Sequence, residues 1–104
     1  MILSTTNRVP EREIAENLGL VKGNTIRARH VGSDIVAGLK NLVGGEISEY
    51  TKLMAESREQ SLDRMVESAE VLGADAIIGI RMSTSMIMNH AAEIVVYGTA
   101  VRLK

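Results

Sequence analysis

The longest regular pattern in the sequence predicts a long helix that leads directly into a buried strand. Apolar residues recur at helical spacing from a start near Glu46 or Ile47, and Gly73 closes the segment as a helix C-cap would. The run Ala76–Met82 that follows is too short and too rich in isoleucine for another helix, so it is expected to be a strand. Such a helix is about 40 Å long, whereas a compact domain of ~100 residues is only roughly 35 Å across. The helix is therefore expected to extend beyond its own core.

Strands are also predicted before this helix. Ile2–Thr6 is short and β-prone, and Pro10, which suits a turn, follows it. The segment Glu13–His30 has two interpretations. Either Gly23-Asn24 is the two-residue turn of a hairpin, or Gly19 and Gly23 are bulges that bend one long strand.

The remaining segments supply a short helix and the end of the sheet. Ser33-Asp34 resembles an N-cap and Gly44-Gly45 a C-cap pair, which predicts a helix of about three turns between them. Ser83–Asn89 continues the preceding strand or forms a loop, and His90–Ala92 is a predicted turn. Glu93–Leu103 alternates regularly and is predicted to be the final strand.

These elements predict one α+β domain over residues 1–104, in the order β-β-α-α-β-β. Its sheet is expected to be antiparallel, with about four strands, packed with one short and one long helix. Both faces of the final strand carry apolar side chains, whereas about two helices can cover only one face. The second face is therefore expected to meet other subunits.

Composition excludes several classes of function. The chain has no Phe or Trp and a net charge of −1, so neither base stacking nor a surface that tracks phosphates is expected. It has no cysteine, which excludes disulfides, thiolate catalysis and thiolate metal sites. Neither a signal peptide nor a membrane span is apparent, so we expect a cytoplasmic protein that binds no nucleic acid or membrane.

Two imidazoles form the first candidate metal site. His30 and His90 are the only histidines, and neither has a second histidine at helical spacing. Folding or symmetry would have to bring them together, with Asp34 as one candidate carboxylate partner. The alternative is that both are ordinary polar residues at strand ends.

Methionines form the second candidate metal site. Met82, Met86, Met88 and His90 all have even numbers, so they share one side of the strand if it runs straight. Thioether and imidazole ligands suit Cu(I). The alternative is that these methionines fill gaps in an aliphatic core.

The Gly44-Gly45-Glu46 turn is the one candidate for a catalytic or phosphate-binding loop. A glycine-rich turn before a helix can bind phosphate, but neither a P-loop lysine nor a GxGxxG pattern accompanies it. The sequence also lacks the GxSxG and SxxK patterns of serine nucleophiles. The turn is therefore interpreted first as a helix cap.

The sequence resembles the YbjQ-like family of small bacterial and archaeal proteins, which are described as putative heavy-metal-binding. The strings that carry this resemblance are LSTT, LGLVKGNTIRARHVG, VGSDIVAGLKNLVGGEISEY, LGADAIIGIRM and YGTAVRLK, which together cover the whole chain. The resemblance implies one long bent strand rather than a hairpin at Gly23-Asn24. It also implies assembly into a ring, as a homopentamer or a pair of pentamers, and supplies no catalytic residues.

The leading hypothesis is a non-enzymatic, homo-oligomeric protein that binds a small ligand or a metal, divalent or Cu(I), where its subunits meet. The candidate ligands are His30, Asp34, Met86, Met88 and His90. One alternative is an enzyme with an inter-subunit site near Gly44-Gly45-Glu46, and another is a purely structural scaffold.

Overall fold

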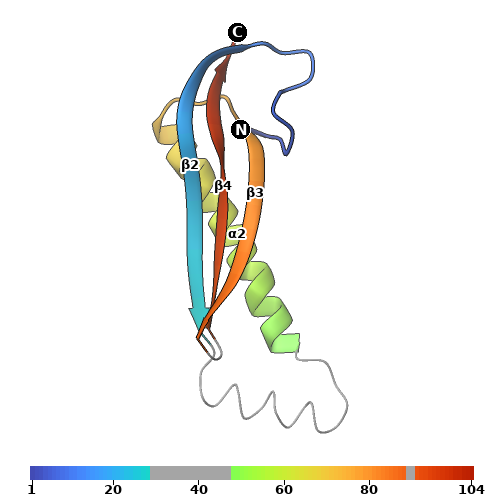
Figure 1. The fold of residues 1–104 in the computed structure, drawn as a ribbon, viewed down its shortest axis with the longest axis vertical. Helices are drawn as coiled ribbons and strands as arrows, with labels where there is room; N and C mark the ends of the chain where they lie inside the picture. The colour runs from blue at the N-terminus through green and yellow to red at the C-terminus, as the bar shows by residue number, and fades with distance from the viewer. Residues whose placement is uncertain (29–47, 89–90) are drawn as a thin grey trace, which may run out of the picture.

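The computed structural model describes residues 1–28, 48–88 and 91–104, which form an α+β fold with one helix on one face of a narrow sheet (Figure 1). The predicted short helix after Asp34, with Gly44-Gly45 at its end, lies outside the described residues. The described elements are β1 Ile2–Leu3, β2 Ile14–Ala28, α2 Ser48–Val71, β3 Ala76–Met88 and β4 Ala91–Leu103. The long helix thus ends two residues before Gly73, as its sequence pattern predicts.

The sheet is mixed rather than wholly antiparallel, with strand order β1-β3-β4-β2. The three long strands pair antiparallel as predicted, but β1 pairs parallel to β3. β1 is also shorter than the predicted strand Ile2–Thr6. After Leu3 the hydroxyls of Ser4 and Thr6 both donate to the Arg8 carbonyl, at 3.2 and 2.9 Å. Such local bonds favour a turn over a continued strand.

The segment before the helix forms one long strand, so the hairpin interpretation is wrong. β2 stays paired with β4 from Gly19, opposite Ala100, to its end at Ala28. Gly19 has a φ of 105° beside a shift in register, which confirms it as a bulge. Gly23 lies in regular pairing instead. A Cβ there would lie 2.5 Å from the Met65 backbone nitrogen, so glycine allows the helix to approach.

The C-terminal hairpin confirms one of the two interpretations of Ser83–Asn89, because β3 continues as a strand to Met88. β4 is longer than predicted and begins at Ala91 rather than Glu93. Ala91 and Ala92 are each paired with β2 on one side and β3 on the other, which keeps them in the sheet. The predicted turn is therefore wrong at these two alanines, while Asn89 and His90 lie outside the described residues.

Each face of the sheet has its own buried cluster. The cluster under the helix contains Val21, Met65, Ala69, Ile77, Ile94, Val96 and Ala100. The cluster on the opposite face contains Val9, Ala76, Ile78, Val101 and Leu103. Val9 belongs to the segment that joins β1 to β2, which lies beside one end of the sheet in Figure 1. The chain therefore covers that end of its second face itself.

Three hydroxyls are buried where the helix meets the sheet, and we call them the hydroxyl cluster: Thr25, Ser57 and Ser61. Thr25 Oγ1 bonds the Ser57 hydroxyl and lies 2.9 Å from Ser61 Oγ. Ser61 Oγ also donates to the carbonyls of Ser57 (3.0 Å) and Ile94 (3.2 Å). These bonds satisfy polar groups that would otherwise destabilise the core.

The molecule is elongated, with extents of 56 × 22 × 17 Å and a radius of gyration of 17.5 Å. A compact chain of this length has a radius of gyration near 13 Å. The helix of 24 residues is about 36 Å long, and the 15 residues of β2 span about 50 Å. The described sheet is therefore longer than the described helix, and longer than a compact domain would allow.

Candidate functional site

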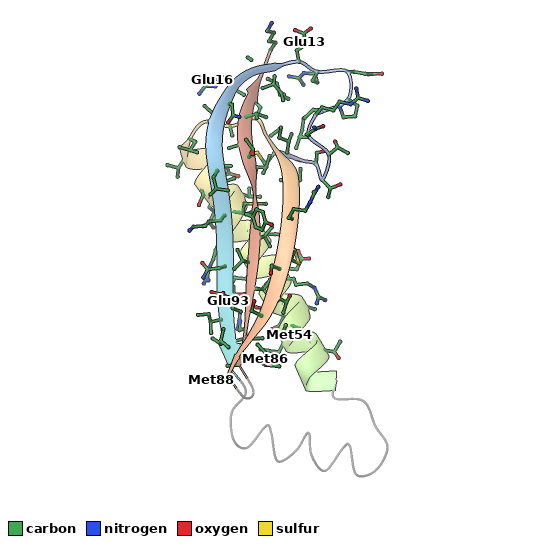
Figure 2. All side chains as sticks on the ribbon, in the orientation of Figure 1. Glu13, Glu16, Met54, Met86, Met88 and Glu93 are labelled. Carbon is green, nitrogen blue, oxygen red and sulfur yellow. The ribbon has the colours of Figure 1, made fainter. Side chains whose placement is uncertain are left out.

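The far end of the β3–β4 hairpin exposes an apolar sequence that we call the methionine end: Met86, Ile87 and Met88. The exposed fractions of these side chains are 66%, 50% and 65%. Figure 2 shows Met86 and Met88 at this end of the sheet, with Met54 of α2 toward the same end. Met54 is half-buried against the core under the helix. The methionine end therefore offers two accessible thioethers.

Exposure separates these methionines from those that fill the core. Met65 is fully buried under the sheet and is a core residue, as the alternative interpretation requires. Met86 and Met88 have no such role, because about two-thirds of each side chain is exposed. Met82 is also exposed, but less so, at 42%.

The strand does not hold its methionines in one row. Met86 pairs with Ala92 and Met88 with Ala91, with a shift in register between them. Adjacent residues of β4 face opposite sides, so the shift places Met86 and Met88 on opposite faces of the sheet. The condition that the strand runs straight is therefore not met. Met82 shares a face with Met86 but lies four residues away, or about 13 Å.

The remaining predicted ligands, His30, Asp34 and His90, lie outside the described residues. Their chain neighbours are nonetheless informative. β2 ends at Ala28, whose cross-strand partner is Ala91, and Ala91 is also the partner of Met88. In the sequence His30 follows Ala28 by two positions and His90 immediately precedes Ala91.

Acidic side chains are sparse at this end among the described residues. Glu93 lies on β4, half-buried, between Ile26 of β2 and Ser85 of β3 (Figure 2). In the described part of the chain, no three His, Cys, Asp or Glu side chains gather in a group that could hold a metal. Within these residues, the donors suited to a metal are thioethers rather than carboxylates.

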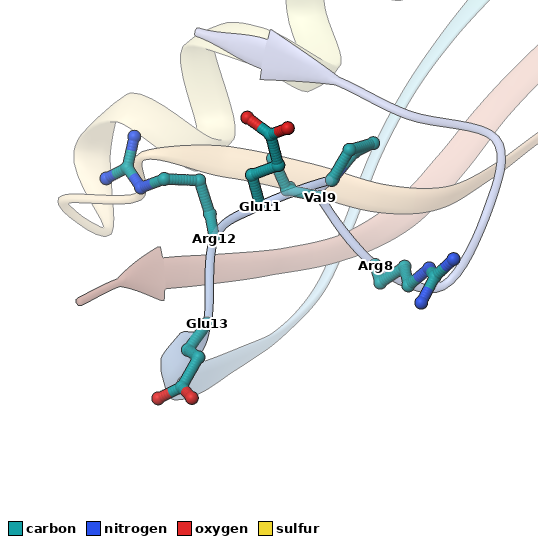
Figure 3. A pocket seen from close by; sticks show the side chains of 6 residues that line it. Arg8, Val9, Glu11, Arg12 and Glu13 are labelled. Carbon is teal, nitrogen blue, oxygen red and sulfur yellow. The ribbon is translucent and has the colours of Figure 1, made fainter.

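A cavity of about 550 Å³ lies at the opposite end, in the segment from Arg8 to Glu13. A turn shapes it, in which the Arg12 backbone nitrogen donates to the Val9 carbonyl at 3.2 Å and Glu11 has a φ of 63°. In the sequence, Pro10 marks this turn, but no pattern predicts a cavity beside it. Figure 3 shows that the charged tips of Arg8, Arg12 and Glu13 point in different directions. They do not converge on one ligand.

Two charged residues beside the cavity bind the C-terminal end of the chain. Arg12 donates to the Lys104 carbonyl at 3.3 Å, and Glu13 forms an ion pair with the Lys104 ammonium at 3.2 Å. These contacts join the segment from Arg8 to Glu13 to the C-terminal end of the chain. The Gly44-Gly45-Glu46 turn, the other predicted loop site, lies outside the described residues. Within the described residues, no helix has the length and apolar character needed to span a membrane.

A protein-family model of the YbjQ type, whose description reads "Putative heavy-metal-binding", matches residues 1–104. A UPF0145 protein of Archaeoglobus fulgidus is 57% identical over 104 residues, which are 100% of this chain and 96% of that protein. A UPF0145 protein of Halorubrum lacusprofundi is 56% identical, with both chains covered completely.

One solved structure has a similar fold. It is the crystal structure of a protein of unknown function from Pediococcus pentosaceus that belongs to the DUF74 family. The TM-score is 0.61 at 16% identity, over 100% of this chain and 98% of that one. At this identity the likeness concerns the fold alone.

Proposed function

The chain belongs to the YbjQ family, and from that premise we propose that it assembles with copies of itself and binds a metal ion through Met86 and Met88 where subunits meet. The ion is Cu(I) or another cation that accepts thioether ligands. The assembly is a ring, of five subunits or of two such rings. His30, Asp34 and His90 are the further ligands.

The exposure of Met86 and Met88 is the observation that carries this proposal. Apolar side chains that are about two-thirds exposed add little to the stability of the subunit. Thioethers are soft ligands that select Cu(I) over hard cations such as Mg²⁺. The described residues contain no carboxylate cluster that would favour a hard cation instead.

The shift in register supports a site that is shared between subunits. Because Met86 and Met88 face opposite sides of the sheet, each presents its sulfur to different surroundings. A neighbouring copy can supply the remaining ligands on each side. The imidazoles of His30 and His90 are candidates, because their chain neighbours Ala28 and Ala91 are paired at this same end.

Metal binding is tested by titrating Cu(I) and Zn(II) into chelator-treated protein and following its melting temperature. An ion present at 100 times its dissociation constant stabilises a protein by about 2.7 kcal/mol, which raises the melting temperature by about 10–20 °C. We expect this rise with Cu(I). Leucine preserves side-chain volume, so M86L/M88L should fold normally but bind at least about tenfold more weakly.

The matched control is M82L, which removes a thioether about 13 Å from Met86 on the same face. It should bind Cu(I) as the wild type does. The metal proposal is wrong if neither ion raises the melting temperature, or if M82L loses as much affinity as M86L/M88L.

Assembly is tested separately by light scattering at micromolar concentration. A ring of five has about five times the 11.3 kDa mass of one chain. A mass of one chain would overturn the ring. An oligomer that binds no metal would leave a structural scaffold, whereas a reaction abolished by changing Gly44-Gly45-Glu46 would favour the enzyme alternative.

A further inference from the structure

One edge of the sheet is covered along only part of its length. Near its start, β3 pairs with the N-terminal segment: Ser4 N donates to the Ile77 carbonyl at 2.9 Å, and Gly79 N donates to the Thr6 carbonyl at 2.7 Å. From Met82 to Met88, β3 has β4 on one side, and no described strand lies on the other. We call this segment the open edge.

The open edge carries little that would prevent pairing with another strand. Its sequence, MSTSMIM, has no charge, proline or glycine, and all seven residues are exposed. Proteins usually protect such edges with lysine, proline, bulges or covering segments. Here the shift between Met86 and Met88 is the one such feature in the described residues. A β-prone, uncharged edge of this length is a template for strand addition.

We infer that the open edge pairs with the outer edge of β2 in a second copy of the chain, so that the sheet continues from subunit to subunit. This inference rests on the self-assembly part of the proposed function and is independent of the metal. Among the described elements, β1 and β2 each have one unpaired side as well, and only β2 is long enough to match the open edge. Each copy would thus contact one neighbour through its open edge and another neighbour through the outer edge of its β2.

The open edge and the outer edge of β2 match in their position along the sheet and in strand direction. Val96 of β4 pairs with Met82 on one side and Gly23 on the other, and Ala92 pairs with Met86 and Arg27. The open edge therefore lies level with the last residues of β2. Both strands run antiparallel to β4, so copies related by an axis along the strands would pair them in parallel.

This head-to-tail arrangement can pair the open edge of every copy. A heterologous contact forms a ring if its rotation closes, and a closed sheet has no unpaired edges. Pairing two open edges with each other would instead form a dimer and leave both β2 edges unpaired. The observed pair of complementary edges therefore favours the ring.

Cysteine cross-linking tests the arrangement, because the chain has no cysteine of its own. Ser83 and Asn24 are exposed and flank Val95 on the same face of the sheet. Within one subunit they are two strand spacings apart, about 9.6 Å, which exceeds the ~7 Å that a disulfide can bridge. A disulfide in N24C/S83C therefore joins two copies.

Two further pairs allow for a stagger of two residues in either direction: N24C/S85C and I26C/S83C. We expect one of the three double variants to form a ladder of covalent oligomers under oxidising conditions. Each single variant should remain uncross-linked. Dimers of S83C or S85C alone would overturn the inference, since they would show the open edge pairing with itself.

Hydrogen exchange provides a second measurement that is independent of register. Alternate amides of residues 82–88 point away from β4, and they are protected only if the open edge is paired. Fast exchange of these amides in an oligomeric protein would overturn the edge pairing but leave self-assembly intact. A monomer by light scattering would overturn both, and failure of the Cu(I) titration would affect neither.

Discussion

Replacement of Gly23 by alanine is predicted to destabilise the protein severely, because the helix backbone occupies the space of the new side chain. The added Cβ would lie 2.5 Å from the Met65 nitrogen and 2.9 Å from Arg64 Cβ, and closer still to the Ser61 carbonyl oxygen. Two of these three atoms belong to the main chain. No change of rotamer can therefore relieve the clash.

The helix would have to retreat by about 1 Å to restore ordinary contact distances, because close-packed interiors do not absorb such overlaps. Overpacking costs about 1–3 kcal/mol, and the retreat also lengthens the bonds of the hydroxyl cluster, at about 1 kcal/mol. We therefore expect G23A to lower the free energy of unfolding by about 2–4 kcal/mol. The melting temperature should fall by about 8–30 °C.

The predicted change in the free energy of unfolding is opposite in sign to the change that glycine-to-alanine replacement usually causes. Gly23 does not have a positive φ, and at such positions alanine ordinarily stabilises a protein by about 0.4–1 kcal/mol. Thermal unfolding followed by circular dichroism at one protein concentration measures the difference. K22A, a change at the exposed neighbouring residue, is the control and should stay within about 0.5 kcal/mol of the wild type.

An unchanged or higher melting temperature for G23A would refute the close approach of α2 to β2.

Two further changes test other parts of the fold. T25V keeps the side-chain shape but removes the hydroxyl that bonds Ser57, so it should lower the free energy of unfolding by about 1–2 kcal/mol. The triple variant T25V/S57A/S61A, in which all three side chains are apolar, should lower it by less than the sum of the three single changes. Strict additivity in urea unfolding would contradict a shared hydroxyl cluster. E11G should raise the free energy of unfolding by about 0.5–1 kcal/mol, because Glu11 has a φ of 63° that glycine adopts without strain. A lower melting temperature for E11G would show that the Glu11 side chain itself stabilises the turn.

The long elements could be predicted from the sequence because their patterns are local. Helical spacing and Gly73 placed the end of α2 within two residues, and alternation identified most of β4. The resemblance to the YbjQ-like family correctly favoured one long β2. The direction of β1 was not predictable, because a strand of two residues has no periodicity and its pairing depends on distant parts of the chain.

The candidate site was less predictable, because its geometry depends on packing. A buried methionine such as Met65 and an exposed one such as Met88 look alike in sequence. The shift between Met86 and Met88 arises in the pairing with β4, so the even numbering of the predicted ligands could not reveal it. Glycine is similarly ambiguous: Gly19 forms a bulge, whereas Gly23 allows a close approach.

The position of Gly23 also explains why β3 is the strand that remains open. A helix is about 10 Å wide, and strands lie about 4.8 Å apart, so one helix covers about two strands. Gly23 and the hydroxyl cluster draw α2 onto β2 and β4, where Ser61 bonds the Ile94 carbonyl. Along the open edge, β3 then lies beyond the helix, which leaves Met82 42% exposed although it is on the helix side of the sheet. The close packing that stabilises the subunit thus leaves uncovered the strand through which we infer that it joins its neighbour.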